Sequence, residues 1–141
     1  MKENEALFVI KPDGLDRVVR EKRLTQLIEG LFAATGLTRI SQIDKNLTKE
    51  EVFQIYPILK VPDPVYGEGW KERLITHMTS QQIRCYWIKG EQAEEKANII
   101  KRFLRKTLCD QSTEKGKIIE NVAHVADTSD FENTFNVFFH K

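Results

Sequence analysis

Residues 121–128, NVAHVADT, are the stretch around which this chain is organised. A short apolar run carries His124 and ends in an acidic turn, as a strand entering a loop does. Ser129 and Glu132 have the spacing of a capping box, which predicts that a helix begins near Thr128 or Ser129. Phenylalanines at i, i+4, i+7 and i+8 then form one apolar helical face: Phe131, Phe135, Phe138 and Phe139. A histidine at a strand end is either a reactive group or a partly buried residue bonded to a backbone carbonyl.

Residues 6–14, ALFVIKPDG, form a second informative stretch near the other end of the chain. The apolar run predicts a buried strand, and Pro-Asp-Gly predicts a tight turn after it. Lys11 has two interpretations at this strand end. It is a solvated lysine of a surface turn, or a lysine held by a rigid turn and aimed at phosphate oxygens. A helix is expected from residue 16 or 17, with Gly36 placed to end it.

Hydrophobic periodicity and breaker residues predict the remaining elements. They are a strand over 38–43, a helix over 48–56, a proline-rich loop, a helix over 70–78, a strand over 83–88, a helix over 93–108 and a strand before His124. Thr48 and Glu51 supply a capping box for the first of these helices. In the helix over 93–108 the residues expected to face the core are Ile99, Ile100, Phe103 and Leu104.

The predicted order is β-α-β, a helical pair, β-α-β and a closing helix. This order favours an α+β fold, a ferredoxin-like βαββαβ sandwich with a four-stranded antiparallel sheet and added helices. A doubly wound parallel sheet is the alternative, although the number of strands is small for it. We expect one domain over residues 1–141.

The composition is that of an ordinary globular protein, with 40% hydrophobic and 30% charged residues. A net charge of +1 gives no global field that would favour nucleic acid or an anionic membrane. The sequence has no signal-peptide pattern and no apolar run of the ~20 residues that span a bilayer. Cys85 and Cys109 are isolated, which indicates free thiols in a cytoplasmic protein rather than a zinc site. P-loop, GxGxxG and GxSxG motifs are absent from the sequence.

The two ends together resemble a nucleoside diphosphate kinase. The residues that carry the resemblance are 8–14, FVIKPDG, with Asn121, His124 and Asp127. The resemblance covers nearly the whole chain, from residue 7 to residue 139. The fold of that family is a ferredoxin-like sandwich, which agrees with the order of elements predicted from the residues alone.

The resemblance implies an enzyme that passes the γ-phosphate of a nucleoside triphosphate to a nucleoside diphosphate by a ping-pong route. His124 would be the nucleophile and become a phosphohistidine, because a neutral imidazole nitrogen can attack in line. By the same match Lys11 contacts the transferred phosphate, Asn121 binds the sugar or phosphate region, and Tyr56 packs near the histidine. Mg²⁺ would be bound through the nucleotide phosphates, with no protein metal ligands.

The middle of the chain matches the family less closely. Tyr66 resembles the aromatic residue that stacks on the base, although Val65 can align instead and a rim aromatic is an equal interpretation. Arg102 and Thr107 resemble a phosphate-binding pair, and the alternative is that this basic cluster is the solvated face of a helix. The implied partners are nucleoside di- and triphosphates. The implied assembly is a homo-oligomer built on a dimer through the second strand and first helix.

Three features differ from the family pattern. Val125 and Ala126 stand where the family has Gly-Ser after its histidine. Thr134 and Phe135 occupy the neighbourhood of the expected acidic partner, with Glu132 one turn earlier. The loop before the last strand is short and lacks an Arg-Gly element. These differences motivate a second hypothesis, a catalytically weak or inactive nucleotide-binding or scaffolding protein, and a third, an interaction domain that binds no nucleotide.

Overall fold

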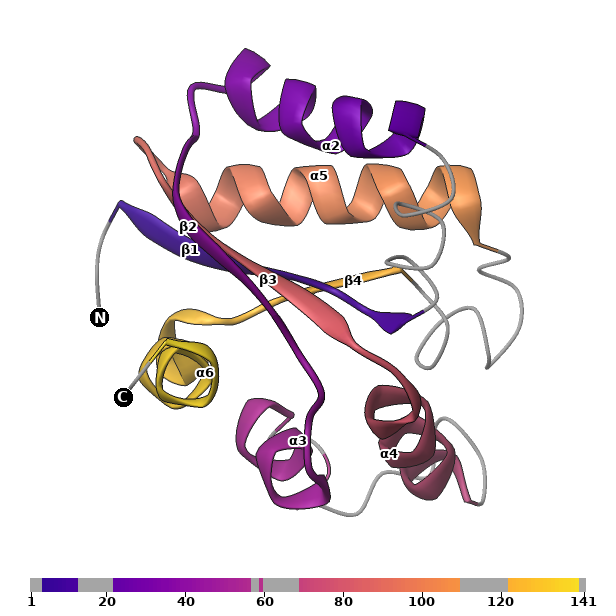
Figure 1. Ribbon diagram of the computed structural model, residues 1–141. Coiled ribbons are helices and arrows are strands. Elements are labelled where there is room, and N and C mark those ends of the chain that lie inside the picture. Colours follow the sequence, from indigo (N-terminus) through magenta and orange to yellow (C-terminus); the bar gives the residue numbers. More distant parts are fainter. Residues whose placement is uncertain (1–3, 13–21, 57–58, 60–68, 110–121, 140–141) are drawn as a thin grey trace.

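A computed structural model describes residues 4–12, 22–56, 59, 69–109 and 122–139 of the chain (Figure 1). The strands are β1 (Glu5–Ile10), β2 (Thr38–Lys45), β3 (Ile83–Lys89) and β4 (Ala123–Val125). The helices are α2 (Lys22–Ala34), α3 (Lys49–Ile55), α4 (Trp70–Ser80), α5 (Ala93–Leu108) and α6 (Phe131–Phe138), with a 3-10 turn, η3 (Thr128–Asp130), before α6. The predicted order of elements is confirmed. The predicted start of the first helix, at residue 16 or 17, lies outside the described residues.

The four strands form one antiparallel sheet in the order β2-β3-β1-β4. In the register, Val9 of β1 lies opposite Cys85 on one side and opposite His124 on the other. This order is that of a ferredoxin-like sandwich, so the predicted fold class is confirmed. The alternative, a doubly wound parallel sheet, is wrong because each of these strand pairs is antiparallel.

Helices cover both faces of the sheet (Figure 1). α2 and α5 lie on one face, while α3, α4 and α6 lie on the other. The central strand β1 serves both layers, since Phe8 packs toward α2 and α5 and its neighbours Leu7 and Val9 pack toward the other three helices. Burial on both faces explains why β1 is a continuous apolar run rather than an alternating one.

The end of α2 is set by Gly36, as the sequence predicts. The N–H of Gly36 donates to the carbonyl of Ala33 at 3.1 Å, and that of Leu37 donates to Phe32 at 2.8 Å, which is a Schellman motif. Gly36 has φ +81°, a conformation open to glycine. A Cβ on Gly90 would lie 2.5 Å from the Gly36 carbonyl oxygen, so this turn packs directly against the end of β3.

The predicted capping box at the start of α3 is present. The hydroxyl of Thr48 accepts from the Glu51 N–H at 3.2 Å, and the Glu51 carboxylate accepts from the Thr48 N–H at 2.9 Å. Lys45 donates to the same carboxylate and to the carbonyl of Val137 at 2.7 Å. β2 and α6 are therefore joined to the first turn of α3, and Tyr56 is the C-cap at the other end of this helix.

The inward face predicted for α5 is wrong at two of its four positions. Ile100 and Leu104 are buried, but Ile99 and Phe103 are 51% and 47% exposed. The buried stripe of α5 is completed by Ala93 and Ala97, whose small side chains let the helix lie close to the sheet. Ile99 lies about 100° around the helix from Ile100 and so turns away from that stripe.

The predicted capping box of α6 is also wrong. The chain first makes the 3-10 turn η3 from Thr128, and α6 begins at Phe131 without a side-chain cap at Asp130. Ser129 lies within that turn and is exposed, so its hydroxyl does not occupy the cap position. The predicted phenylalanine face is present, with Phe131 and Phe138 buried and Phe135 and Phe139 partly buried.

Neither of the two cysteines is in a disulfide. Burial raises the pKa of the Cys85 thiol, so this residue packs in the core as a neutral side chain. Within the part of the chain that the structure describes, no helix is both long enough and apolar enough to cross a membrane.

Candidate functional site

The backbone just before His124 is strained. Val122 is fully buried and has φ +70°, in a region that β-branched residues rarely adopt. Its carbonyl accepts a hydrogen bond from the Lys11 N–H at 2.8 Å, which joins the end of β1 to the start of β4. Strain of this kind costs on the order of 1–3 kcal/mol and persists where the surroundings enforce it, often at functional sites. Lys11 and His124 are thereby placed on neighbouring strands.

His124 is the middle residue of β4 and faces the layer of α3, α4 and α6. It lies opposite Val9 in the register, and residues directly opposite each other in a sheet share a face. The ring of Tyr56 covers the imidazole, with a centroid distance of 4.4 Å. One ring nitrogen is hydrogen-bonded to the backbone of Ile55. The other, Nε2, is buried and has no partner among the described residues, so the bond to Ile55 is made by Nδ1.

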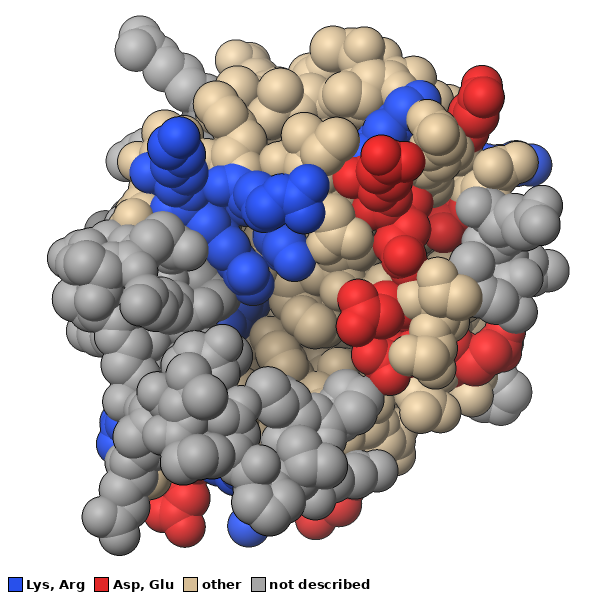
Figure 2. All heavy atoms as spheres, turned by 180° about the vertical axis from the view of Figure 1, so that it is seen from behind, with Lys and Arg blue, Asp and Glu red and all other residues tan. Residues whose placement is uncertain are grey.

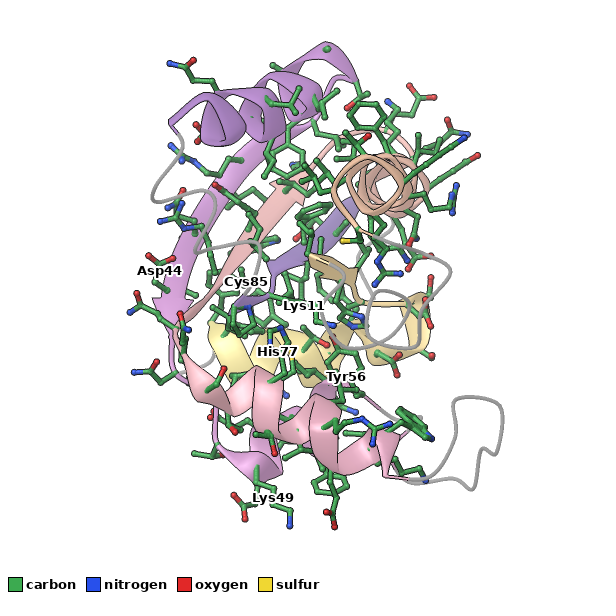
Figure 3. All side chains as sticks on the ribbon, turned by 90° about the vertical axis from the view of Figure 1, so that its right-hand side faces the viewer. Lys11, Asp44, Lys49, Tyr56, His77 and Cys85 are labelled. Carbon is green, nitrogen blue, oxygen red and sulfur yellow. The ribbon has the colours of Figure 1, made fainter. Side chains whose placement is uncertain are left out.

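Lys11 is fully buried at the end of β1. Its Nζ lies 5.9 Å from the centroid of the Tyr56 ring, within the range of a cation–π contact. Figure 3 shows Lys11 and Tyr56 on the same side of the molecule, where the end of β1 meets α3 and α4. The Tyr56 ring therefore lies against both the ammonium of Lys11 and the imidazole of His124.

α5 brings two more cations to this edge of the sheet. Arg105 donates from Nη2 to the carbonyl of Ala123 at 2.6 Å, directly beside His124. Lys101 lies one turn earlier on the same helix and acts electrostatically on His124, Arg105 and Asp127. In Figure 2 the Lys and Arg side chains gather on one part of this face, beside a hollow, and the Asp and Glu side chains gather on the other part.

These surroundings keep His124 neutral. Burial, and after it the positive charges of Lys11, Arg105 and Lys101, lower the pKa of His124 from 6.5 to about 3, against the opposing effect of the hydrogen bond to Ile55. The three described side chains whose charges act on His124 are all positively charged. The Nε2 lone pair therefore faces a positive environment, which suits attack on an electrophile that carries negative charge.

The pKa of Lys101 is also lowered. Burial, and after it the neighbouring charges of Arg105 and Arg102, lower its pKa from 10.5 to about 8, while Asp127 has the opposite effect. The ammonium of Lys101 thus loses its proton more readily than an ordinary lysine. A bound anion would restore the charged form, because it would offset the repulsion between the three cations.

The structure brings together three of the predicted site residues, His124, Lys11 and Tyr56. Arg102 and Thr107 are exposed on α5, and their role in phosphate binding stays a prediction. Tyr66, its alternative Val65, and Asn121 lie outside the described residues.

Lys101 and Arg105 were not predicted as site residues. Their i, i+4 spacing in the basic cluster of α5 puts them on one side of the helix, and this spacing is the signal that could have identified them. The side of a helix that faces an edge strand depends on how the helix lies on the sheet. That orientation is set by the buried stripe through Ala97 and Ile100.

The structure shows the surroundings of the residues that differ from the family pattern. Val125 and Ala126 are buried in the two cores, and the Ala126 N–H donates to the carbonyl of Leu7. Thr134 is fully buried, and its hydroxyl has no partner among the described residues. Glu132 is exposed and lines a separate cavity beside Trp87.

No family model matches the chain, and no curated protein matches its sequence. Solved structures of nucleoside diphosphate kinases do match. The enzyme from Pyrobaculum aerophilum is 22% identical, with a TM-score of 0.64 over 96% of this chain and 95% of its own. The enzyme from Halobacterium salinarum in complex with CDP is 17% identical, with a TM-score of 0.66 over 99% and 90% of the two chains. The Aquifex aeolicus enzyme is 16% identical, with a TM-score of 0.63 over 94% and 92%. At these identities the similarity establishes the fold.

Proposed function

We propose that this chain, which has the fold of the nucleoside diphosphate kinases, transfers the γ-phosphate of a nucleoside triphosphate to a nucleoside diphosphate through a phosphohistidine at His124. The observation that carries the proposal is the state of that imidazole. Its Nε2 is without a partner among the described residues, and its pKa is lowered to about 3. A histidine that served only to fill the core would gain stability from a second hydrogen bond.

The first half-reaction starts from the neutral imidazole. The Nε2 lone pair attacks the γ-phosphorus and forms a P–N bond, while the bond from phosphorus to the bridging oxygen breaks and the diphosphate leaves with its electron pair. The proton on Nδ1 stays on the ring, held by the backbone of Ile55. In the second half-reaction a terminal oxygen of another diphosphate takes the phosphoryl group, and the neutral imidazole returns.

The cations around His124 have a direct electrostatic role in this transfer. Lys11, Arg105 and Lys101 repel a proton from the imidazole in the free protein, and the same charges attract the phosphate oxygens of a nucleotide. Tyr56 keeps the ring in place by contact with its face. We assign Asn121, Arg102 and Thr107 to the remaining contacts with the sugar and phosphates, and Tyr66 to stacking on the base.

Mg²⁺ would neutralise part of the phosphate charge when it is bound with the nucleotide. The described charged side chains that shift the pKa of His124 are cations, which fits an ion held by phosphate oxygens rather than by protein carboxylates. In the described part of the chain, no three His, Cys, Asp or Glu side chains are grouped as metal ligands.

A second candidate function is nucleotide binding without efficient turnover. It is favoured by the surroundings of His124, where the described side chains that shift its pKa include no carboxylate to orient the ring. The loss of one hydrogen bond to a charged group costs about 1.5–3 kcal/mol. Such a loss would slow the transfer by roughly tenfold to a hundredfold.

We also propose that the chain forms a homo-oligomer built on a dimer through β2 and α2. β2 is an edge strand, and two of its apolar side chains, Ile40 and Ile43, are 43% and 36% exposed. An exposed edge with apolar side chains favours pairing with a second copy.

We further propose that the protein acts in the cytoplasm, where its thiols would stay reduced.

The experiment that tests the kinase proposal is intact-mass measurement after mixing with Mg²⁺-ATP. The wild type should gain one phosphate and lose it when a nucleoside diphosphate is added, and His124→Ala should gain none. His77→Ala is the matched control, because it removes a histidine on α4 and should leave phosphorylation intact. Phosphate on His124→Ala would overturn the assignment. ATP binding without phosphate on the wild type would favour the second candidate function.

A further inference from the structure

A second cavity lies on the same face of the sheet as His124, near the start of β1. It has a volume of about 270 Å³ and is lined by Glu5, Trp87, Phe131, Glu132 and Phe135. Glu5 begins β1, whereas Val9, opposite His124, lies four residues further along. At the rise of an extended strand this is a separation of about 13 Å. The cavity is therefore distinct from the site proposed for phosphate transfer.

Three aromatic rings form the walls of this cavity. Trp87 and Phe135 have centroids 4.9 Å apart and an interplanar angle of 82°. Phe131 is nearly parallel to Phe135, at 16° and a centroid distance of 6.0 Å. Because Trp87 stands almost perpendicular to the two phenylalanines, the rings enclose a corner rather than a flat patch. A corner of this kind offers both ring faces and ring edges to a small group.

The same cavity carries two acidic residues. Glu5 accepts a hydrogen bond from the Trp87 indole N–H at 2.6 Å, so its carboxylate is fixed against the aromatic wall. Glu132 is exposed at the rim, in the first turn of α6. Lys89 lies opposite Glu5 in the strand register, but its side chain is exposed and does not line the cavity. Negative charge and aromatic faces together attract a cation.

We propose that this cavity binds a quaternary ammonium group, such as the trimethylammonium head of a short-chain compound. A primary ammonium needs acceptors for three N–H groups, whereas three of the five lining side chains are hydrocarbon or indole rings and the Glu5 carboxylate already accepts from Trp87. A quaternary ammonium has no N–H and is stabilised by aromatic faces and by nearby carboxylates. The volume, about 270 Å³, is just below the range of small-molecule sites, roughly 300–1,000 Å³, so the cavity suits a head group rather than a whole cofactor.

The indole N–H of Trp87 provides a readout that does not depend on phosphate transfer. The chain contains two tryptophans, so an ¹⁵N-labelled sample gives two indole signals, assigned with Trp87→Phe. Titration with choline should shift the Trp87 signal saturably, because this N–H is hydrogen-bonded to a wall of the cavity. The signal of Trp70, which is buried in the core next to α3, should stay in place.

A neutral ligand of the same shape separates charge from shape. 3,3-Dimethylbutan-1-ol replaces the nitrogen of choline by carbon, and it should bind about tenfold more weakly. Glu5→Gln and Phe135→Leu should each weaken choline binding severalfold, while Glu72→Gln, on the exposed surface of α4, should not change it. Equal binding of choline and the alcohol, or no saturable shift with choline, would overturn the proposal.

Two sources of the group can be compared in the same titration. Tighter binding of choline than of N-acetyl-trimethyllysine amide would indicate that the natural ligand is a free small molecule. The opposite order would indicate that it is a methylated lysine side chain. Either order supports the site. Glu5 lies about 13 Å along β1 from the position opposite His124, and Phe135 packs on Trp87 in this cavity. Phosphate transfer by these variants should therefore match the wild type whichever ligand binds, so failure of this site would not be confused with failure of the kinase proposal.

Discussion

The ring of Tyr56 lies 4.4 Å from the imidazole of His124, centroid to centroid, at an interplanar angle of 36°. The two residues are 68 positions apart in the chain (124 minus 56), and one is the C-cap of α3 while the other is the middle of β4. The same ring lies under the ammonium of Lys11. The position of the imidazole relative to the Lys11 ammonium therefore depends on where α3 ends.

Replacing Tyr56 tests this dependence. Tyr56→Leu removes the aromatic surface against His124 and should slow formation of the phosphohistidine by up to about tenfold, given the ~0.5–1.5 kcal/mol of an aromatic pair. Tyr56→Phe keeps the ring against His124 and removes the hydroxyl, which contacts the Met78 sulfur at 3.9 Å, so it should stay close to the wild-type rate. Single-turnover quench kinetics measure both. Equal rates for the Leu and Phe variants would contradict the positioning role.

The pKa of His124 predicts how stability depends on pH. In the folded state the imidazole stays neutral down to about pH 3, whereas in the unfolded chain it binds a proton below about 6.5. Between these values the unfolded state holds more protons, so the free energy of unfolding falls as the pH falls, by at most about 1.4 kcal/mol per pH unit from this residue.

Urea unfolding of the wild type and of His124→Asn at several pH values measures this contribution. The variant should lose less stability than the wild type on acidification. His77→Asn, which replaces a partly buried histidine on α4 in the same way, is the matched comparison. Parallel stability curves for the wild type and His124→Asn would show that burial does not perturb His124.

The lowered pKa of Lys101 predicts how the activity falls at alkaline pH. Its pKa is lowered to about 8, so a rise in pH above that value removes one of the positive charges beside His124. The kcat/KM for a nucleoside triphosphate reports the free protein and should fall as the pH rises through about 8. Lys101→Arg keeps its charge and should move this limb to higher pH. Lys106→Arg, at an exposed position of the same helix, is the control and should leave the limb in place.

Thr134 is a place where the protein can be stabilised. Its buried hydroxyl has no hydrogen-bond partner among the described residues. Thr134→Val keeps the shape and removes this polar group, so the free energy of unfolding should rise by about 1 kcal/mol. Thr79→Val on α4 is the comparison, because its hydroxyl already donates to the carbonyl of Ile75 at 2.9 Å. Thermal unfolding of both variants gives the result, and a lower melting temperature for Thr134→Val would show that its hydroxyl is satisfied in solution.

Local patterns in the sequence were sufficient for most of the architecture. The buried run before Lys11 predicted β1, the Thr48 capping box predicted the start of α3, and Gly36 predicted the end of α2. Each of these signals acts over a few residues, through backbone hydrogen bonds or left-handed φ angles that the residue types themselves favour. The Ser129 capping box failed because the tight turn after β4 imposed a 3-10 geometry on the same residues.

The sequence by itself determined the strands and helices, their order, and a set of residues that includes Lys11, Tyr56 and His124. Only the tertiary structure decided which cations of α5 approach His124, how far its pKa is lowered, and that Glu5 holds the Trp87 indole across 82 positions of the chain. The physical reason is that desolvation and charge interactions depend on distances in space. Residues far apart in the chain set those distances when they pack, and periodicity along the sequence does not record them.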